Sequence, residues 1–268
     1  MKLTILTDNN TFIDRYYLGE PAAAYYVEID GLRILFDTGY SDTALVNASK
    51  MGIDLSRLTH IVLSHGHNDH TGGLPFLRDA FDLSETELVY GPDCFLPRWE
   101  KGISIGSPMT EEEARRSFRC LPTAKPRFLS ENCCVLGRIP AIHEFDRRRI
   151  IGEILKDGKK KPDYVLDDTA MACRTKKGLF IITGCSHSGI CNIISYGQKV
   201  VRQSHVTAVL GGFHLMERDG RLLSTIRFME SLALDALYPC HCTSLFARAA
   251  MMRTLPVAET GVGLTVEI

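Results

Sequence analysis

One short stretch of the chain decides how the rest is interpreted: Ser64-His65-Gly66-His67-Asn68-Asp69-His70-Thr71-Gly72-Gly73-Leu74. It follows His60-Ile61-Val62-Leu63, an apolar run with the composition of a short buried strand. A strand end is a rigid support that can hold side chains in a fixed geometry. The first two histidines of the stretch are two residues apart in an extended loop, so both can point to one metal ion. The aspartate and third histidine follow on the next turn and can reach a second position nearby.

Three further histidines also follow apolar runs. They stand in Gly184-Cys185-Ser186-His187-Ser188-Gly189, in Gly211-Gly212-Phe213-His214 and in Pro239-Cys240-His241-Cys242. A single histidine after a strand is usually a structural residue, but several in one pattern weaken that interpretation. Imidazoles beside a carboxylate suit Zn²⁺, Mn²⁺ or Fe better than Ca²⁺ or Mg²⁺. The pattern therefore predicts a site for divalent metal ions.

The composition excludes several classes of protein. The chain has 268 residues, of which 45% are hydrophobic, and a net charge of −1 from 31 basic and 32 acidic residues. This balance argues against a large nucleic-acid or membrane surface and favours a small-molecule substrate. No apolar run reaches the roughly 20 residues that span a membrane. The nine cysteines are odd in number and irregularly spaced, which is typical of a reduced, cytoplasmic protein. Nothing in the sequence indicates the oligomeric state.

The chain is expected to form a single domain over 1–268. Residues 92–162 hold seven of the eleven prolines, and we interpret them as an insertion, or cap, that covers the site. We expect hairpins over 25–36, with Asp30-Gly31 as the turn, and over 170–183. Helices are expected before Gly52, after a cap at Thr110, and over 192–203.

The histidine stretch, together with Leu35-Phe36-Asp37-Thr38-Gly39, resembles the signature of metallo-β-lactamase-fold hydrolases. Gly184–Ile190, Gly211–Leu215 and His241-Cys242-Thr243 narrow the resemblance to the branch named for 7,8-dihydropterin-6-methyl-4-(β-D-ribofuranosyl)aminobenzene 5′-phosphate synthase. The resemblance covers nearly the whole chain and is weakest over 92–162. It implies an α/β fold, a four-layer αββα sandwich, with a dinuclear metal site along one edge of the two sheets.

The resemblance also implies a set of ligands for two divalent ions, Zn²⁺ first and Mn²⁺ or Fe as alternatives. His65 and His67 would bind the first ion, and Asp69, His70 and His241 the second. His187 follows a strand where many relatives have a bridging aspartate, and it would replace that residue. Asp37 would hold a ligand imidazole by its other nitrogen.

One ligand of the superfamily, its third histidine, has no obvious counterpart before residue 170. His143, Asp167 or Asp168 takes its place, or His187 does that work alone. The cysteines beside the predicted ligands, Cys185, Cys240 and Cys242, are interpreted as small buried filler in preference to a thiolate site. No Cys-x₂-Cys pair is present to favour the second interpretation.

The expected activity is that of a metal-dependent hydrolase or transferase acting on a small phosphorylated or pterin-like substrate. Two ions would turn a bound water into hydroxide that attacks a phosphorus or carbonyl centre. Asp69 would orient this nucleophile, and His214 would protonate the leaving group or grip a phosphate. Two alternatives stay open: a phosphodiesterase or nuclease, and a metal-binding sensor or partner protein with vestigial catalysis.

Overall fold

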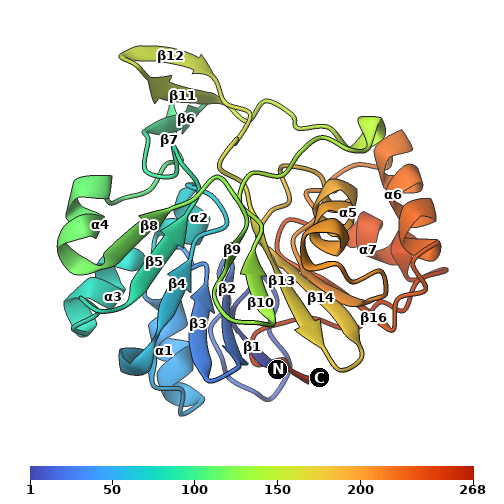
Figure 1. Cartoon of the computed structure of the whole chain (residues 1–268), viewed down its shortest axis with the longest axis horizontal. Helices are drawn as coiled ribbons and strands as arrows, with labels where there is room; N and C mark the ends of the chain where they lie inside the picture. Colours follow the sequence, from blue (N-terminus) through green and yellow to red (C-terminus); the bar gives the residue numbers. More distant parts are fainter.

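Two β-sheets packed face to face form the centre of the molecule in a computed structural model that describes residues 1–268 (Figure 1). The first sheet has the order β17-β1-β2-β3-β4-β5-β8. Its strands are β1 (Lys2–Thr7), β2 (Ala24–Ile29), β3 (Leu32–Phe36), β4 (His60–Val62), β5 (Glu87–Tyr90), β8 (Arg119–Pro122) and β17 (Thr265–Glu267).

The second sheet has the order β16-β15-β14-β13-β10-β9. Its strands are β9 (Arg127–Phe128), β10 (Cys133–Val135), β13 (Ala170–Thr175), β14 (Gly178–Thr183), β15 (Val206–Gly211) and β16 (Ala236–Pro239). Both sheets mix antiparallel hairpins with parallel neighbours, as β14, β15 and β16 are parallel to one another.

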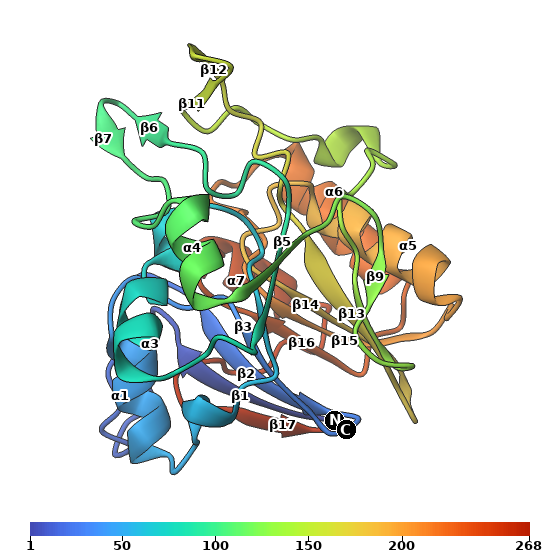
Figure 2. The same cartoon turned by 60° about the vertical axis from the view of Figure 1, so that its left-hand side comes forward.

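Helices cover the outer face of each sheet, which gives four layers (Figure 2). The helices on the first sheet are α1 (Thr43–Lys50), α3 (Leu74–Ala80) and α4 (Glu111–Ser117), with the one-turn helix α2 (Asn68–Thr71) at its end. The helices on the second sheet are α5 (Ile190–Val201), α6 (Gly220–Glu230) and α7 (Leu245–Met251). The short 3₁₀ turns are Leu55–Arg57 and Glu144–Asp146. The predicted αββα sandwich is therefore confirmed.

The alternation of side chains along β14 shows why the sheets need cover on both faces. Leu179 and Ile181 pack into the cluster under the second set of helices, whereas Phe180 and Ile182 pack between the sheets. Successive side chains of a strand point to opposite faces of the sheet. A strand with apolar residues at every position must therefore be covered on both faces. The continuous apolar runs of the sequence thus require a layered fold.

Several elements confirm the predictions made from local signals. The β2–β3 hairpin turns at Asp30 and Gly31, both with positive φ, which matches the twist of the strands. The β13–β14 hairpin pairs Ala170 with Thr183. Helix α4 begins at a complete capping box between Thr110 and Glu113.

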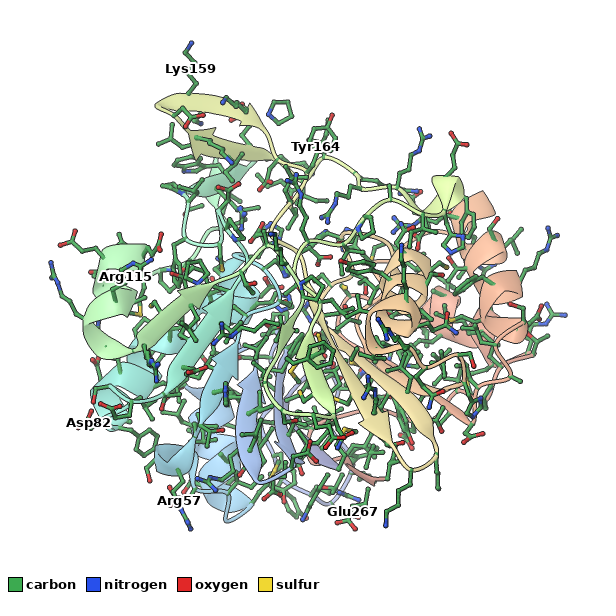
Figure 3. The ribbon with its side chains drawn as sticks, in the orientation of Figure 1. Arg57, Asp82, Arg115, Lys159, Tyr164 and Glu267 are labelled. Atoms are coloured by element: carbon green, nitrogen blue, oxygen red, sulfur yellow. The ribbon has the colours of Figure 1, made fainter.

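Residues 92–162, expected as one insertion, are divided among three sheets. Strands β8, β9 and β10 lie within the two main sheets, because their backbones complete ladders with β5 and β13. The remainder forms a small separate sheet of β6 (Arg98–Glu100), β7 (Ile103–Ser104), β11 (Glu153–Lys156) and β12 (Lys159–Pro162). We call this sheet the arm. Figure 3 shows Lys159 at its tip and Tyr164 near its base.

The carboxyl ends of several strands meet at the edge of the sandwich that lies nearest to the arm (Figure 1). Strands β3, β4 and β5 run parallel in the first sheet, and β14, β15 and β16 run parallel in the second. Loops that follow parallel strands leave a sheet at one edge, which is where α/β proteins bind ligands. None of the helices has the length and apolar composition needed to cross a membrane.

The packing between the sheets predicts a large loss of stability for Phe180→Ala. Phe180 is fully buried, and its removal leaves a cavity that the two sheets cannot close. We expect the free energy of unfolding to fall by about 3–5 kcal/mol in urea denaturation. Phe128→Ala removes the same side chain from a position that is 48% exposed, and it should cost less than about 1 kcal/mol. Equal losses in the two variants would contradict this layered core.

Candidate metal centre

The loop after β4 brings the first predicted ligands into the interior. His65 is fully buried and His67 is 7% exposed, although both lie in a loop. Gly66 between them passes so close to its neighbours that a Cβ there would lie 1.8 Å from the Cys94 carbonyl oxygen. A side chain at this position would push the loop outward, so glycine allows the two imidazoles to turn inward together.

A buried carboxylate fixes the orientation of two imidazoles. Asp37 follows β3 in a left-handed conformation, with φ of 58°. Its oxygens accept hydrogen bonds from the Ser64 amide at 2.6 Å and the Ser64 hydroxyl at 2.7 Å, and one of them lies 2.7 Å from His70 Nδ1. Ser64 Oγ in turn lies 2.9 Å from His65 Nδ1. With Nδ1 occupied in this way, Nε2 of His70 is the nitrogen left for a ligand.

The loop after β14 contributes His187 and the thiol of Cys185. Ser186 between them has φ of 57°, which turns the chain sharply at the sheet edge. Asp168 accepts hydrogen bonds from the backbone amides of His187 and Ser188, at 3.2 and 2.9 Å. Asp168 therefore holds the backbone of this loop, while the His187 imidazole points toward the loop after β4.

The last two histidines stand on similar turns after β15 and β16. His214 and His241 have φ values of 47° and 48°, a conformation that L-residues adopt at a cost of roughly 1–3 kcal/mol. The Asp8 carboxylate, just past β1, accepts a hydrogen bond from the His241 amide at 2.8 Å, and Asn9 Oδ1 lies 3.2 Å from His241 Nδ1. The first sheet thus helps to position a ligand of the second.

The six imidazoles form one continuous cluster. His65 is at its centre, with ring centroids 4.5 Å from His67, 4.3 Å from His70 and 4.7 Å from His187. The cluster extends at one end to His241, 4.9 Å from His70, and at the other to His214, 4.6 Å from His187. The sequence prediction that these side chains come together from separate strand ends agrees with this arrangement.

The candidate ligand atoms fall into overlapping groups, within each of which all atoms lie within 4.8 Å of one another. These groups are Asp69, His70, Cys185 and His241; His65, Cys185 and His187; His65, His67 and Asp69; and Cys185, His214 and Cys242. Cys185 belongs to three of them, and its Sγ lies 3.2 Å from His70 Nε2. Its thiol therefore stands between the two halves of the cluster.

Unpartnered nitrogens show that the cluster fits a metal. His67 Nε2, His187 Nε2 and His241 Nε2 are buried and make no hydrogen bond within the protein. Buried polar atoms without a partner are rare because each one loses its interaction with water. Three of them aimed into one cluster of imidazole, carboxylate and thiol groups form a donor set that divalent metals of the zinc type prefer.

The protonation states of three imidazoles favour metal binding. Burial lowers the pKa of His67 to about 3, and it lowers the pKa of His65 and of His187 well below the usual value. These three imidazoles are neutral at pH 7 and offer free lone pairs. Burial acts in the same direction on His70, but the carboxylates of Asp69 and Asp37 outweigh it and raise the pKa of this imidazole.

The residues considered as substitutes for the third histidine lie in different surroundings. His143 is outside the cluster, with its Nε2 2.8 Å from Ser195 Oγ and its ring against Phe228. Asp167 receives a hydrogen bond from the Gly66 amide at 2.8 Å and an ion pair from Arg98 at 2.5 Å. Asp167 and Asp168 thus hold the two ligand loops by their backbones. Among these candidates, only His187 presents its side chain to the cluster.

The structure shows two features that the sequence does not: the thiol of Cys185 lies among the candidate ligand atoms, and distant residues support the loops. Cys185 was interpreted as filler, because buried cysteine is common and gives no signal of its own. The supporting contacts of Asp8 and Arg98 connect residues 233 and 69 positions apart, which no local pattern reveals.

Known proteins resemble this chain in both sequence and fold. The family profile of the metallo-β-lactamase superfamily matches residues 18–89. The chain is 31% identical to the protein MJ0448 of Methanocaldococcus jannaschii, over 91% of each chain. It is also 31% identical to the 7,8-dihydropterin-6-methyl-4-(β-D-ribofuranosyl)-aminobenzene-5′-phosphate synthase of the same organism, over 84% of this chain and 81% of the relative.

A solved structure matches the whole chain. It is Tm1679, described as a metal-dependent hydrolase of the β-lactamase superfamily, with a TM-score of 0.86 and 26% identity. The alignment covers 100% of this chain and 99% of that one. The chain belongs to the metallo-β-lactamase superfamily, in the branch that contains the dihydropterin-linked synthase of M. jannaschii.

Proposed function

We propose that this protein is a metal-dependent hydrolase, or a transferase, that acts on a small phosphorylated or pterin-like substrate. The observation that carries the proposal is the convergence of buried, unpartnered imidazole nitrogens from both sheets on Asp69 and Cys185. Two similar proteins, one described as a metal-dependent hydrolase and one named as a 5′-phosphate synthase of a dihydropterin compound, support the reaction type and the substrate class.

The proximities divide the ligands between two metal positions. His65, His67 and His187 surround the first, so that His187 supplies the third histidine of the superfamily. Asp69, His70 and His241 surround the second, where Asp69 Oδ2 lies 3.5 Å from His70 Nε2 and 3.3 Å from His241 Nε2. We assign the thiol of Cys185 to the shared position between them, in place of the bridging role expected for His187. A thiolate among imidazoles favours Zn²⁺ over Mn²⁺.

Each group has a definite part in the chemistry. Divalent ions in such a site supply Lewis acidity and lower the pKa of water toward neutrality. Asp69 is the carboxylate at the open side of the cluster, with its side chain 27% exposed, so it can accept a proton from the attacking group. His214 is partly exposed at the end of the imidazole cluster and has an unpartnered Nδ1. It is placed to donate a proton to a leaving oxygen.

His67→Ala should reduce the metal content of the purified protein. The wild type is expected to bind about two Zn²⁺ per chain, and the variant should bind at most about one, because one imidazole of the first position is lost. Elemental analysis by mass spectrometry measures both. His143→Ala removes a histidine outside the cluster and should leave the metal content unchanged. A wild type that binds no metal after dialysis against Zn²⁺ would overturn the proposal.

The same proteins test for turnover. Metal-loaded wild type should hydrolyse at least one probe among phosphate monoesters, phosphodiesters, lactones and thioesters, and His67→Ala should lose this activity. Tight binding of a phosphorylated ligand by the wild type, without turnover of any probe, would instead support a binding or sensor protein.

Cys185→Ser should remove a sulfur ligand from the metal. In Co²⁺-substituted protein, a cysteine ligand gives an intense sulfur-to-metal absorption band in the near ultraviolet. We expect Cys185→Ser to abolish this band, because Cys185 Sγ belongs to both halves of the cluster. Cys120→Ser, a change at a cysteine outside the cluster, should preserve it. If the band survives in Cys185→Ser and disappears in Cys242→Ser, the assignment of the shared thiol is wrong.

Asp37→Asn should weaken metal binding without removing a ligand. The amide preserves the shape of the side chain but cannot accept hydrogen bonds from Ser64 and orient His70 with both oxygens. Loss of such an outer partner typically lowers metal affinity about 10- to 100-fold. Competition with a chelator measures the affinity. Asp30→Asn, at an exposed turn, serves as the matched control, and an unchanged affinity in Asp37→Asn would show that this carboxylate does not position His70.

A further inference from the structure

A separate cavity opens beside the histidine cluster, on the side of the second sheet. Its volume is about 230 Å³, and His214 forms part of its wall. The other polar lining residues are Arg149, Glu217, Asp219 and Arg221. Pockets for whole drug-sized ligands measure roughly 300–1,000 Å³. A cavity of this size, adjoining the candidate metal centre, suits one polar group of a larger substrate.

Arg221 is the unusual group in this cavity. Its side chain is only 6% exposed, and its Nε donates to the buried Asp146 carboxylate at 2.7 Å. Nε makes the only hydrogen bond of the guanidinium within the protein, and Nη2 is buried with no partner. A buried guanidinium normally fills its donors, and its planar fork matches the oxygens of phosphate or carboxylate. The unpartnered donors of Arg221 therefore suit an oxyanion ligand.

Neighbouring groups support an anion at the same place. Arg149 also lines the cavity, where its Nη2 donates to Asp219 at 3.0 Å. This ion pair is exposed and therefore weak, so Arg149 can exchange Asp219 for a ligand. Helix α6 begins at Gly220, beside Arg221, and its N-cap Asp219, which accepts a hydrogen bond from the Leu222 amide at 3.0 Å, also lines the cavity. His214 Nδ1 is buried and unpartnered, and its ring lies 4.6 Å from that of His187.

We propose that this cavity is the subsite for a phosphate group that the substrate retains during the reaction. Arg221 binds two phosphate oxygens with its free donors, Arg149 adds a second positive charge, and His214 connects the subsite to the histidine cluster. Glu217 and Asp219, both in the wall of the cavity, oppose the anion and limit its affinity. The inference rests on the proposed function, because the subsite would bind the phosphate of the substrate and so position the rest of the substrate beside the metals.

Calorimetric titration with inorganic phosphate tests the subsite in metal-loaded protein. Arg149→Gln and Arg221→Lys should each weaken phosphate binding about tenfold or more, since each loses a charge-assisted or forked contact. Glu217→Gln should strengthen it. Arg119→Gln, at an exposed ion pair on β8 far from the cavity, should leave it unchanged. Arg149 and Glu217 can be changed without disturbing the buried pair of Arg221 and Asp146, which keeps the test open if Arg221→Lys folds poorly.

His67→Ala separates binding at the arginines from binding at the metals. If the arginines form the subsite, His67→Ala should still bind phosphate, and Arg149→Gln should lower its phosphate affinity by the same factor as in the wild type. Phosphate affinities of the arginine variants within twofold of the wild type would overturn the subsite, whether or not the metals bind phosphate. If the wild type holds no metal and yet binds phosphate through Arg149 and Arg221, the subsite stands and the proposed metal-dependent function fails.

Discussion

The close approach of the two sheets at Gly184 is the constraint on which the site depends. At the end of β14, a Cβ on Gly184 would lie 2.1 Å from Ser64 Oγ and 2.8 Å from an Asp37 oxygen. No other residue permits this approach without moving the β4 loop. The approach brings the imidazoles of the β4 loop, in the first sheet, against those of the β14, β15 and β16 loops in the second. A gap of a few ångströms between the sheets would leave two half-sites.

The energetic cost of this arrangement is visible around the cluster. Asp37, Ser186, His214 and His241 all adopt left-handed backbone conformations, and several ligand nitrogens are buried without partners. Such features persist only where the surrounding structure enforces them. Here these conformations are enforced by the burial of both faces of the strands and by carboxylates that accept hydrogen bonds from the backbone amides of the loops. The interior thus stores an unfavourable arrangement that a bound ion would relieve.

Much of this could be predicted from the sequence because the signals were local. The stretch 64–74 combines a strand, glycines and ligand-type side chains in one loop, and the β2–β3 turn is specified by two adjacent residues. Strands β8 and β10 were missed because they have only four and three residues, so that only their pairing with β5 and β13 defines them. Arg221 gave no signal either, because its partner Asp146 lies 75 positions away. The place of the Cys185 thiol among the candidate ligand atoms could not be predicted either, since those neighbours come from other strands.

The fully buried Arg98 has a mechanical consequence for the arm. It stands on β6, and it pairs with Asp163 at 2.9 Å and with Asp167, the residue that also holds Gly66 in the ligand loop. Separating a buried charge from its partners typically costs about 3–5 kcal/mol, so the base of the arm cannot act as a hinge. Bending is left to the outer turns at Gly102 and Gly158, where nothing packs within 4 Å of a Cβ position. The base of the arm is therefore rigid, because it is anchored in the same ion cluster that holds the loop after β4.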